Sequence, residues 1–179
     1  MSKYARFTST QLSLAALAVA VAAAGSATAA SISATASGTV IAPIDITKTA
    51  DLAFGNFAAS AAPGTVTIST SGARTTGGGV TGISGGTAPS AAQFNVTGQA
   101  SATYSINVVA DPLTSGGNTM SFAPVTDLDG AGAIAGTVAS GTLSAGGTQS
   151  IFVGGVLTVA ANQAAGTYSG NVTATVNYN

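Results

Sequence analysis

The fold is decided by one short stretch, Val172-Thr173-Ala174-Thr175-Val176-Asn177-Tyr178. Its apolar residues hold every even position and its polar residues every odd position. Side chains alternate between the two faces of a β-strand, so this pattern predicts a strand with one buried face and one exposed face. The buried face is expected to carry Val172, Ala174, Val176 and Tyr178.

Weaker forms of this pattern occur upstream, separated by turns rich in Gly, Ser and Asn. Strands are predicted at residues 64–69, 93–97, 104–108, 120–122 and 151–159. Within the last of these, Gly154-Gly155 predicts a bulge or bend. After the first thirty residues no stretch has helical spacing with plausible caps. Short strands at this spacing predict an all-β fold, a β-sandwich.

Two loops carry fragments of binding motifs. Residues 75–88 are rich in glycine, but neither a Lys-Ser/Thr pair nor a helix follows. A long flexible hairpin loop is therefore expected there, and not a phosphate-binding loop. Asp127-Leu128-Asp129-Gly130 lacks the remaining oxygen ligands of a calcium loop, so an ordinary Asp-Gly turn is expected.

The first 29 residues have the pattern of a cleavable signal peptide. Lys3 and Arg6 precede a 13-residue apolar run at residues 12–24, and Ala27 and Ala29 form an Ala-x-Ala cleavage site. The apolar run is too short to span about 30 Å of hydrocarbon. We therefore expect export, cleavage after Ala29 and no membrane span in the mature chain, residues 30–179.

The composition excludes most chemistry. The 179 residues include four Lys+Arg, five Asp and no Glu, His or Cys. The chain lacks the His and Cys that a Ser-His-Asp or Cys-His nucleophile, or a thiolate or imidazole metal site, would need. A basic face for nucleic acid cannot form. The chain is expected not to be an enzyme and to use no catalytic, metal or cofactor site.

The mature chain must fold on a thin core. Val, Ile, Leu and Phe make up 32 of its 150 residues, just above the ~20% below which disorder is expected. Without cysteine there is no disulfide to add stability. Packing and backbone pairing must therefore hold the domain together.

The start of the mature chain is a second regular alternation. In residues 31–40 the residues Ile32, Ala34, Ala36, Gly38 and Val40 fall on one face, and Ser or Thr on the other. Pro43 ends the pattern, and the domain proper begins with Ile44. This stretch is either the first strand of its own sandwich or a strand that completes the sheet of a neighbour. Alternation alone does not separate the two.

The end of the chain resembles the last strand of chaperone–usher fimbrial (pilin-like) subunits. Those proteins commonly end in a Gly-x-Tyr-x-Gly segment, an alternating strand and a penultimate Tyr, matched here by residues 166–170, 172–178 and Tyr178. Residues 31–40 match their donor strand in position and pattern. The middle of the chain is similar to uncharacterised, secreted, Ala/Gly/Thr-rich bacterial domains. Many fimbrial subunits carry a disulfide, which this chain cannot form.

The resemblance implies an incomplete immunoglobulin-like sandwich, residues 44–179, preceded by an N-terminal extension, residues 30–43. The implied donor-strand residues are Ile32, Ala34, Ala36, Gly38 and Val40. The implied acceptor and chaperone-binding residues are Val172, Ala174, Val176, Tyr178 and Asn179.

The same resemblance implies the partners. A periplasmic chaperone would cover the groove first, and at an outer-membrane usher the donor strand of the next copy would replace it. The product would be a head-to-tail surface fibre, a pilus. The alternative is a self-contained secreted or surface-associated β-sandwich, such as a biofilm or adhesin component, that does not polymerise.

Overall fold

The computed structural model describes residues 28–179, in two units, residues 28–39 and residues 40–179. The described residues contain no helix, and so none that could cross a bilayer. They form eleven strands: β1 (Asp45–Ala50), β2 (Phe57–Ile68), β3 (Arg74–Gly82), β4 (Ala92–Thr97), β5 (Thr103–Ala110), β6 (Leu113–Ser115), β7 (Asn118–Met120), β8 (Phe122–Asp127), β9 (Ser140–Thr142), β10 (Thr148–Val159) and β11 (Val172–Tyr178).

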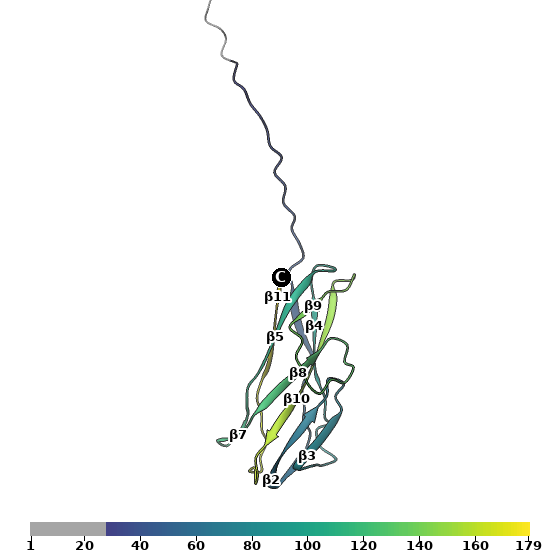
Figure 1. Cartoon of the computed structure of the whole chain (residues 1–179), viewed down its shortest axis with the longest axis vertical. Coiled ribbons are helices and arrows are strands. Elements are labelled where there is room, and N and C mark those ends of the chain that lie inside the picture. The colour runs from purple at the N-terminus through teal and green to yellow at the C-terminus, as the bar shows by residue number, and fades with distance from the viewer. Residues whose placement is uncertain (1–27) are drawn as a thin grey trace, which may run out of the picture. The chain divides into compact units, whose positions relative to one another are not determined.

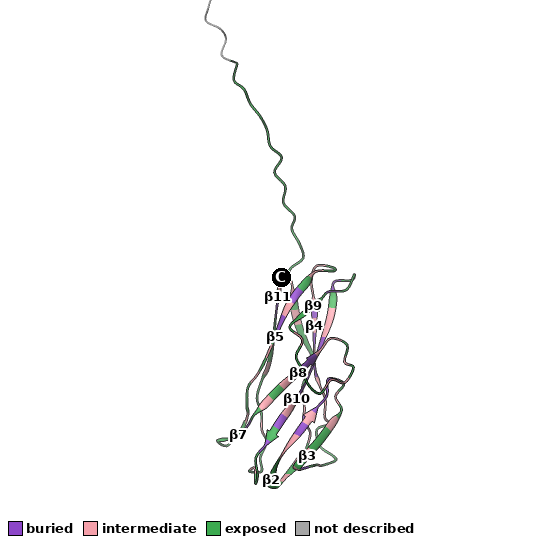
Figure 2. Ribbon diagram, in the orientation of Figure 1, coloured by how far each residue is buried: buried purple, intermediate pink, exposed green. Residues whose placement is uncertain are grey.

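Residues 28–43 belong to no strand, and each of them is exposed, as the green trace in Figure 2 shows. The expected signal peptide, apart from Thr28 and Ala29, lies outside the described residues and stays a prediction. The ordered strands begin at Asp45, next to the boundary expected at Ile44. Residues 31–40 therefore do not form the first strand of their own domain in this structure.

Two antiparallel sheets form the domain of residues 40–179 (Figure 1). The larger has the order β1-β4-β10-β2-β3, with β8 added on β10, and the smaller has the order β11-β5-β9. A separate hairpin joins β6 and β7. The all-β class is therefore confirmed, with two sheets facing one another across an apolar interior.

The interior consists of two clusters of buried side chains. The first lies between the sheets and includes Val96, Tyr104, Ile151 and Val176. The second includes Phe54, Ile68, Met120 and Leu157. The first cluster connects the two sheets, whereas the second lies between the larger sheet and the β6–β7 hairpin.

Among the described residues, Tyr104 is the largest fully buried side chain, and its hydroxyl has no hydrogen-bond partner there. Burial raises the pKa of this phenol above its ordinary value, so the side chain stays neutral at physiological pH. The ring crosses over Gly141, the residue paired with Tyr104 on β9, where an added Cβ would lie 2.6 Å from the hydroxyl. The Tyr104 ring of β5 therefore packs directly on β9, a strand of only three small residues, Ser140–Thr142.

The prediction of a long flexible loop at residues 75–88 was wrong for most of that stretch. Residues 75–82 continue β3 and pair with β2, and only the residues after Gly82 form a loop. The glycines allow two backbones to lie unusually close, since a Cβ on Gly79 would lie 2.0 Å from the carbonyl oxygen of Ala62. Here the register also shifts between Ala59 and Gly64, which marks a bulge in β2.

The bulge predicted at Gly154-Gly155 is also absent, because β10 keeps its register with β4, β2 and β8. These glycines lie where the partner of β10 changes from β4 to β2. A Cβ on Gly155 would lie 1.8 Å from the ring of Phe122. The glycine therefore makes room for an aromatic ring over a regular strand.

Two smaller expectations have different outcomes. The strand expected at residues 120–122 is divided, since β7 ends at Met120 and β8 begins at Phe122. The Asp-Gly turn is confirmed, because the Gly130 N–H donates to Asp127 Oδ1 at 2.7 Å and Gly130 has a φ of 65°. The other carboxylate oxygen of Asp127 accepts a hydrogen bond from the Thr70 hydroxyl.

Replacing Gly155 by Ala is expected to destabilise the domain by about 2 kcal/mol, because the added methyl group must displace the Phe122 ring. The ring is not free to yield, since it packs edge-on against Phe54 with 5.4 Å between centroids. Urea unfolding of Gly155→Ala measures the loss. The matched control is Gly146→Ala, whose Cβ would meet nothing closer than 3.6 Å. Equal stability of the two variants would contradict this account of Gly155.

Candidate functional site

The outer edge of β11 is the first feature of the candidate site. β11 pairs along its whole length with β5, from Val172 opposite Ala110 to Tyr178 opposite Tyr104. In the smaller sheet it is the edge strand, and no described strand pairs with its other side. An edge of this kind presents unpaired backbone groups to any chain that can lie beside it.

The pairing pattern determines which backbone groups are free. The Asp111 N–H donates to the Asn171 carbonyl at 2.9 Å, and the Asn179 N–H donates to the Thr103 carbonyl at 3.3 Å. In an antiparallel pair of strands, every second residue hydrogen-bonds the neighbouring strand through both its N–H and its C=O. Because Asn171 and Asn179 bond the β5 side, the odd residues between them also bond β5. The N–H and C=O groups that point outward therefore belong to the even residues, Val172, Ala174, Val176 and Tyr178.

These four are the acceptor-strand residues expected from the sequence, and the structure brings them together on one strand. Their side chains face the interior, with Val176 buried and the other three half-buried. Thr173, Thr175 and Asn177 face solvent. The fifth expected residue, Asn179, follows the strand, is exposed, and is held by its amide on Thr103.

An apolar seam runs beside this edge. β11 and β1 are edge strands of the two sheets and approach one another. Half-buried Ile44, Ile46 and Leu52 come from the β1 side, and Val172 and Ala174 from the β11 side, all packed against the same core cluster. Along this seam, between the edge strands β1 and β11, the core side chains are therefore incompletely covered.

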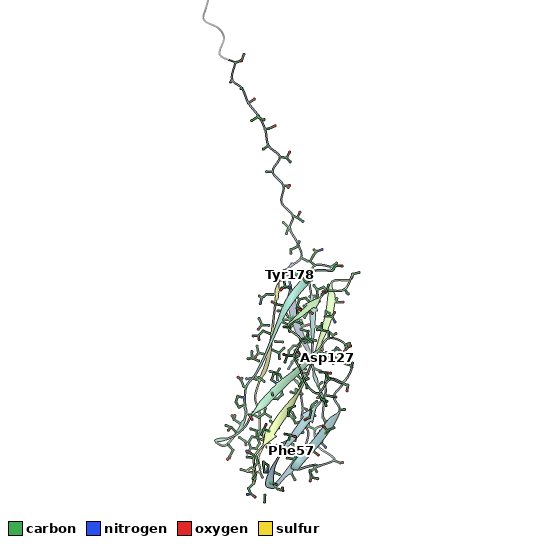
Figure 3. All side chains as sticks on the ribbon, viewed as in Figure 1. Phe57, Asp127 and Tyr178 are labelled. Carbon is green, nitrogen blue, oxygen red and sulfur yellow. The ribbon has the colours of Figure 1, made fainter. Side chains whose placement is uncertain are left out.

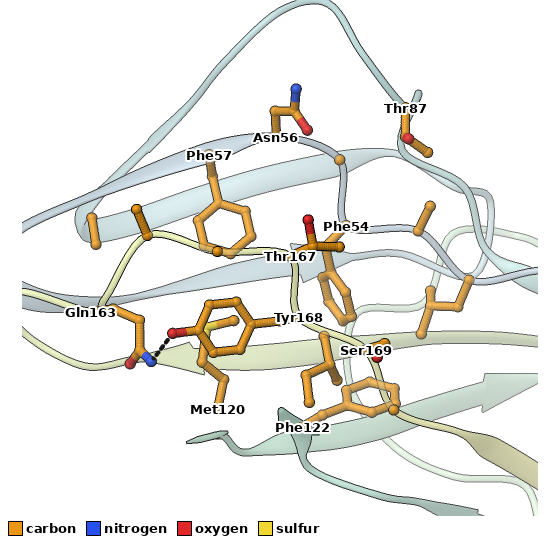
Figure 4. A pocket seen from close by; sticks show the side chains of 18 of the residues that line it. Phe54, Asn56, Phe57, Thr87, Met120, Phe122, Gln163, Thr167, Tyr168 and Ser169 are labelled. Atoms are coloured by element: carbon orange, nitrogen blue, oxygen red, sulfur yellow. Dashed lines mark hydrogen bonds between the residues drawn. The ribbon is translucent and has the colours of Figure 1, made fainter. Parts of the chain in front are cut away.

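A cavity of about 710 Å³ continues from the seam. Its walls are the segment of residues 52–59 and the segment of residues 163–172, which leads into β11 (Figure 4). None of the described residues that line it is charged. Its apolar lining residues include Leu113 and the five labelled in Figure 4, namely Phe54, Phe57, Met120, Phe122 and Tyr168.

Tyr168 lies across the cavity and is held mainly by its own loop. Its hydroxyl donates to the Ala164 carbonyl and accepts from Gln163 Nε2, both at 2.8 Å. Ser169 pairs with Thr114 of β6 through two backbone hydrogen bonds of 2.9 and 3.1 Å. The loop is thus fastened to the β6–β7 hairpin, whereas the Tyr168 hydroxyl makes no bond to the opposite wall.

Arg74 holds that opposite wall. Its guanidinium donates to the carbonyl oxygens of Asn56 at 2.8 Å, Ile83 at 3.2 Å and Phe54 at 3.3 Å. Gly55 has a φ of 69°, and a Cβ there would lie 2.8 Å from Arg74 Nη1. Arg74 therefore fixes the turn between Phe54 and Phe57, the two aromatic residues of the wall.

The far end of β11 is closed. The Tyr178 hydroxyl donates to the Ala42 carbonyl at 2.9 Å and accepts from the Gln99 N–H at 2.6 Å. The Gln99 side chain accepts in turn from the Ala42 N–H at 3.4 Å. Figure 3 places Tyr178 near one end of the domain and Phe57, in the cavity wall, near the other.

The expected donor-strand residues form no site within the described chain. Ile32 and Val40 are fully exposed, and Ala34, Ala36 and Gly38 lie in the same exposed stretch without a strand partner. Of the expected cleavage-site residues, Ala29 is exposed and Ala27 lies outside the described residues.

Residues 44–178 match a protein family described as "Domain of unknown function (DUF4402)". The chain belongs to this family. The matched region begins where the seam begins and ends at Tyr178, so in this DUF4402 domain the free edge and the cavity both lie within the family's limits. No curated protein and no solved structure matches the chain.

The sequence of this DUF4402 domain predicts the strand β11, but it gives no sign of the cavity. Phe54, Phe57 and Met120 come from three separate segments, and no alternation links them. In the sequence, Tyr168 stands out only as part of the Gly-x-Tyr-x-Gly segment. The sequence feature that distinguishes Arg74 is its charge, because only two cationic side chains follow residue 6.

Replacing Arg74 by Met is expected to destabilise the domain by roughly 2 kcal/mol, because three carbonyl groups lose a charged donor. Arg74→Lys is expected to recover only part of this loss, since an ammonium group cannot reproduce the planar fork. Thermal unfolding measures both variants.

The matched control for Arg74 is Lys48→Met, because Lys48 is the other cation of the domain and forms an exposed ion pair with Asp51. Exposed pairs contribute little, about 0–1 kcal/mol. A loss for Arg74→Met no larger than that for Lys48→Met would show that Arg74 does not hold the wall.

Proposed function

We propose that this protein is a structural subunit of a bacterial surface fibre, a pilus, assembled by donor-strand exchange. In this proposal the domain is an incomplete immunoglobulin-like sandwich that lacks its last strand. Residues 31–40 of one copy supply that strand to the next copy. The single observation that carries the proposal is the unpaired outer edge of β11 beside an incompletely covered apolar seam.

Backbone chemistry supports a strand as the missing component. The four even residues of β11 present N–H and C=O groups along one line. A strand laid beside them satisfies these groups with its own backbone, and its inward side chains cover the seam. A small apolar molecule would cover the side chains but leave the backbone groups unbonded.

The exposed extension has the side-chain pattern that such a strand needs. Opposite residues of an antiparallel pair point to the same face. A strand hydrogen-bonded to the even residues of β11 would therefore direct Ile32, Ala34, Ala36, Gly38 and Val40 toward the core. The small residues suit a narrow seam, and Ile32 and Val40 would contribute about 1.5–3 kcal/mol each when buried.

The proposed donor and acceptor segments of one subunit together allow a polymer. Donor and acceptor are different surfaces of the chain, so each contact leaves one of each free. A head-to-tail contact of this kind that does not close into a ring generates a filament.

Export and assembly complete the proposal. The leader, residues 1–29, would direct the chain through the inner membrane. In the periplasm a chaperone would cover the edge of β11, with Asn179 at its end, and an outer-membrane usher would exchange that cover for the next subunit. The mature protein would then reside in an extracellular fibre.

Replacing Ile32 by Asp is expected to abolish polymer formation, because a carboxylate would have to enter the apolar seam. Size-exclusion chromatography and electron microscopy of the exported protein measure this. The matched control is Ser33→Asp, which places the same charge on the opposite face of the strand and is expected to polymerise. Fibres formed equally by both variants would refute the donor-strand assignment.

A further inference from the structure

The proposed donor strand is tethered close to the acceptor edge of its own domain. Residues 31–40 join the domain at Ala42, and the Ala42 carbonyl accepts a hydrogen bond from Tyr178, the last residue of β11. The extension therefore starts at one end of the edge that it would pair with in another copy. Two segments joined by a short flexible linker have an effective concentration in the millimolar range.

Such a tether favours the wrong partner. Separate copies at micromolar concentration would compete with the tethered strand at a disadvantage of about a thousandfold. Pairing in cis would also fill the edge of β11 and leave no acceptor for the next subunit. Because specificity is a difference between two affinities, a chain that pairs in trans needs a feature that disfavours its own extension.

The directions of the strands show what pairing in cis would require. β11 ends beside Ala42, and β1 begins nearby at Asp45. Residues 31–40 laid along the seam between these strands would run parallel to β11 and antiparallel to β1. The chain would then have to reverse its direction within residues 41–44 to form a hairpin with β1.

The backbone at Ala42 and Pro43 disfavours this reversal. Pro43 has a φ fixed near −65°, and its ring restricts Ala42 to extended conformations. The two-residue turns that are favoured in β-hairpins need a positive φ at their first central residue. Neither Ala42 nor Pro43 has a positive φ in the structure.

Hydrogen bonds from the domain hold Ala42 in addition. The Ala42 N–H donates to Gln99 Oε1 at 3.4 Å, and the Ala42 carbonyl accepts from the Tyr178 hydroxyl at 2.9 Å. The same hydroxyl accepts from the Gln99 N–H at 2.6 Å. Both backbone groups of Ala42 are therefore bonded to side chains of the domain, and a change of chain direction at Ala42 would break these bonds.

The loop after β4 is shaped around the Tyr178 hydroxyl. A Cβ on Gly98 would lie 2.2 Å from the hydroxyl oxygen, so only glycine leaves room for it there. The Gly98 N–H donates to the Gly147 carbonyl at 2.9 Å, which fixes this part of the loop. The position of the hydroxyl is thus determined by the domain and not by the extension.

We propose that Tyr178 and Gln99 are positioning residues, which hold Ala42 and Pro43 in an extended path and so direct the extension to a second copy instead of its own β11. This inference rests on the proposed function. It is supported by the single chain, in which residues 28–43 form no strand although no described strand pairs with the outer edge of β11.

Tyr178→Phe tests the role of the hydroxyl, because it removes both hydrogen bonds and keeps the ring. Pairing in cis is expected to increase roughly tenfold relative to pairing in trans, and the amount of polymer in size-exclusion chromatography is expected to fall. The matched control is Tyr104→Phe, since Tyr104 lies opposite Tyr178 and its hydroxyl has no partner among the described residues. Equal amounts of polymer from the two variants would overturn the inference.

A cysteine pair reports which chain supplies the strand, since the protein has no cysteine of its own. Ala36→Cys/Ala174→Cys places one thiol at the centre of the alternating segment and the other within β11. After oxidation with oxidised glutathione, pairing in trans gives ladders on non-reducing gels, whereas pairing in cis gives a cross-linked monomer. Ladders are expected from the parent pair, and a roughly tenfold larger share of cross-linked monomer is expected once Tyr178→Phe is added.

Gln99→Met provides a second variant that leaves Tyr178 in place. It removes only the hydrogen bond from the Ala42 N–H, so a smaller shift toward cross-linked monomer is expected. A folded Gln99→Met with the same share of cross-linked monomer as the parent pair would contradict the role given to Gln99.

The outcomes separate this inference from the proposed function. Ladders from every variant, with one constant share of cross-linked monomer, would remove the role of Tyr178 and Gln99 but keep donor-strand exchange. Cross-linked monomer without polymer from the parent pair would refute the proposed function itself, because the extension would then complete its own sheet. Polymer without ladders from the parent pair would refute the donor-strand assignment.

Discussion

The proposed role of this domain depends on one strand edge, the outer edge of β11, which no described strand pairs with. β11 is bonded to β5 on one side, and its even residues turn their backbone groups the other way. The same residues point their side chains at the core. Unbonded backbone groups and incompletely covered apolar side chains therefore lie along the same strand edge. An added strand would bond the backbone groups and cover the side chains at once, which is why the edge is proposed to bind one.

The rest of the domain holds that edge and its surroundings in place with little apolar material. Glycines at Gly155 and Gly141 let the rings of Phe122 and Tyr104 pack directly on backbone. Arg74 ties the turn after Phe54 to the end of β3 through three carbonyl groups. With no cysteine in the chain, close backbone approach and this guanidinium act where a larger core or a disulfide would otherwise be needed.

Period-two alternation predicted the strands that have one buried face. β4, β5 and β11 were found this way, and β11 was found with its observed bounds. Alternation failed where glycine replaces a side chain, as in β3 through Gly77–Gly79 and in β9 around Gly141, because the pattern there depends on a partner's ring or backbone. The cavity could not be predicted, since Phe54, Met120 and Tyr168 meet only through the tertiary fold.

The most direct test of the central claim is residue-resolved amide hydrogen exchange of β11. In the single subunit, the amides of Val172, Ala174, Val176 and Tyr178 are expected to exchange rapidly, and those of Thr173, Thr175 and Asn177 slowly. Addition of a synthetic peptide of residues 31–41 is expected to protect the first group and leave the second unchanged. Slow exchange of all seven amides in the isolated subunit would contradict the account, because it would mean that the outer edge of β11 is already paired within its own chain.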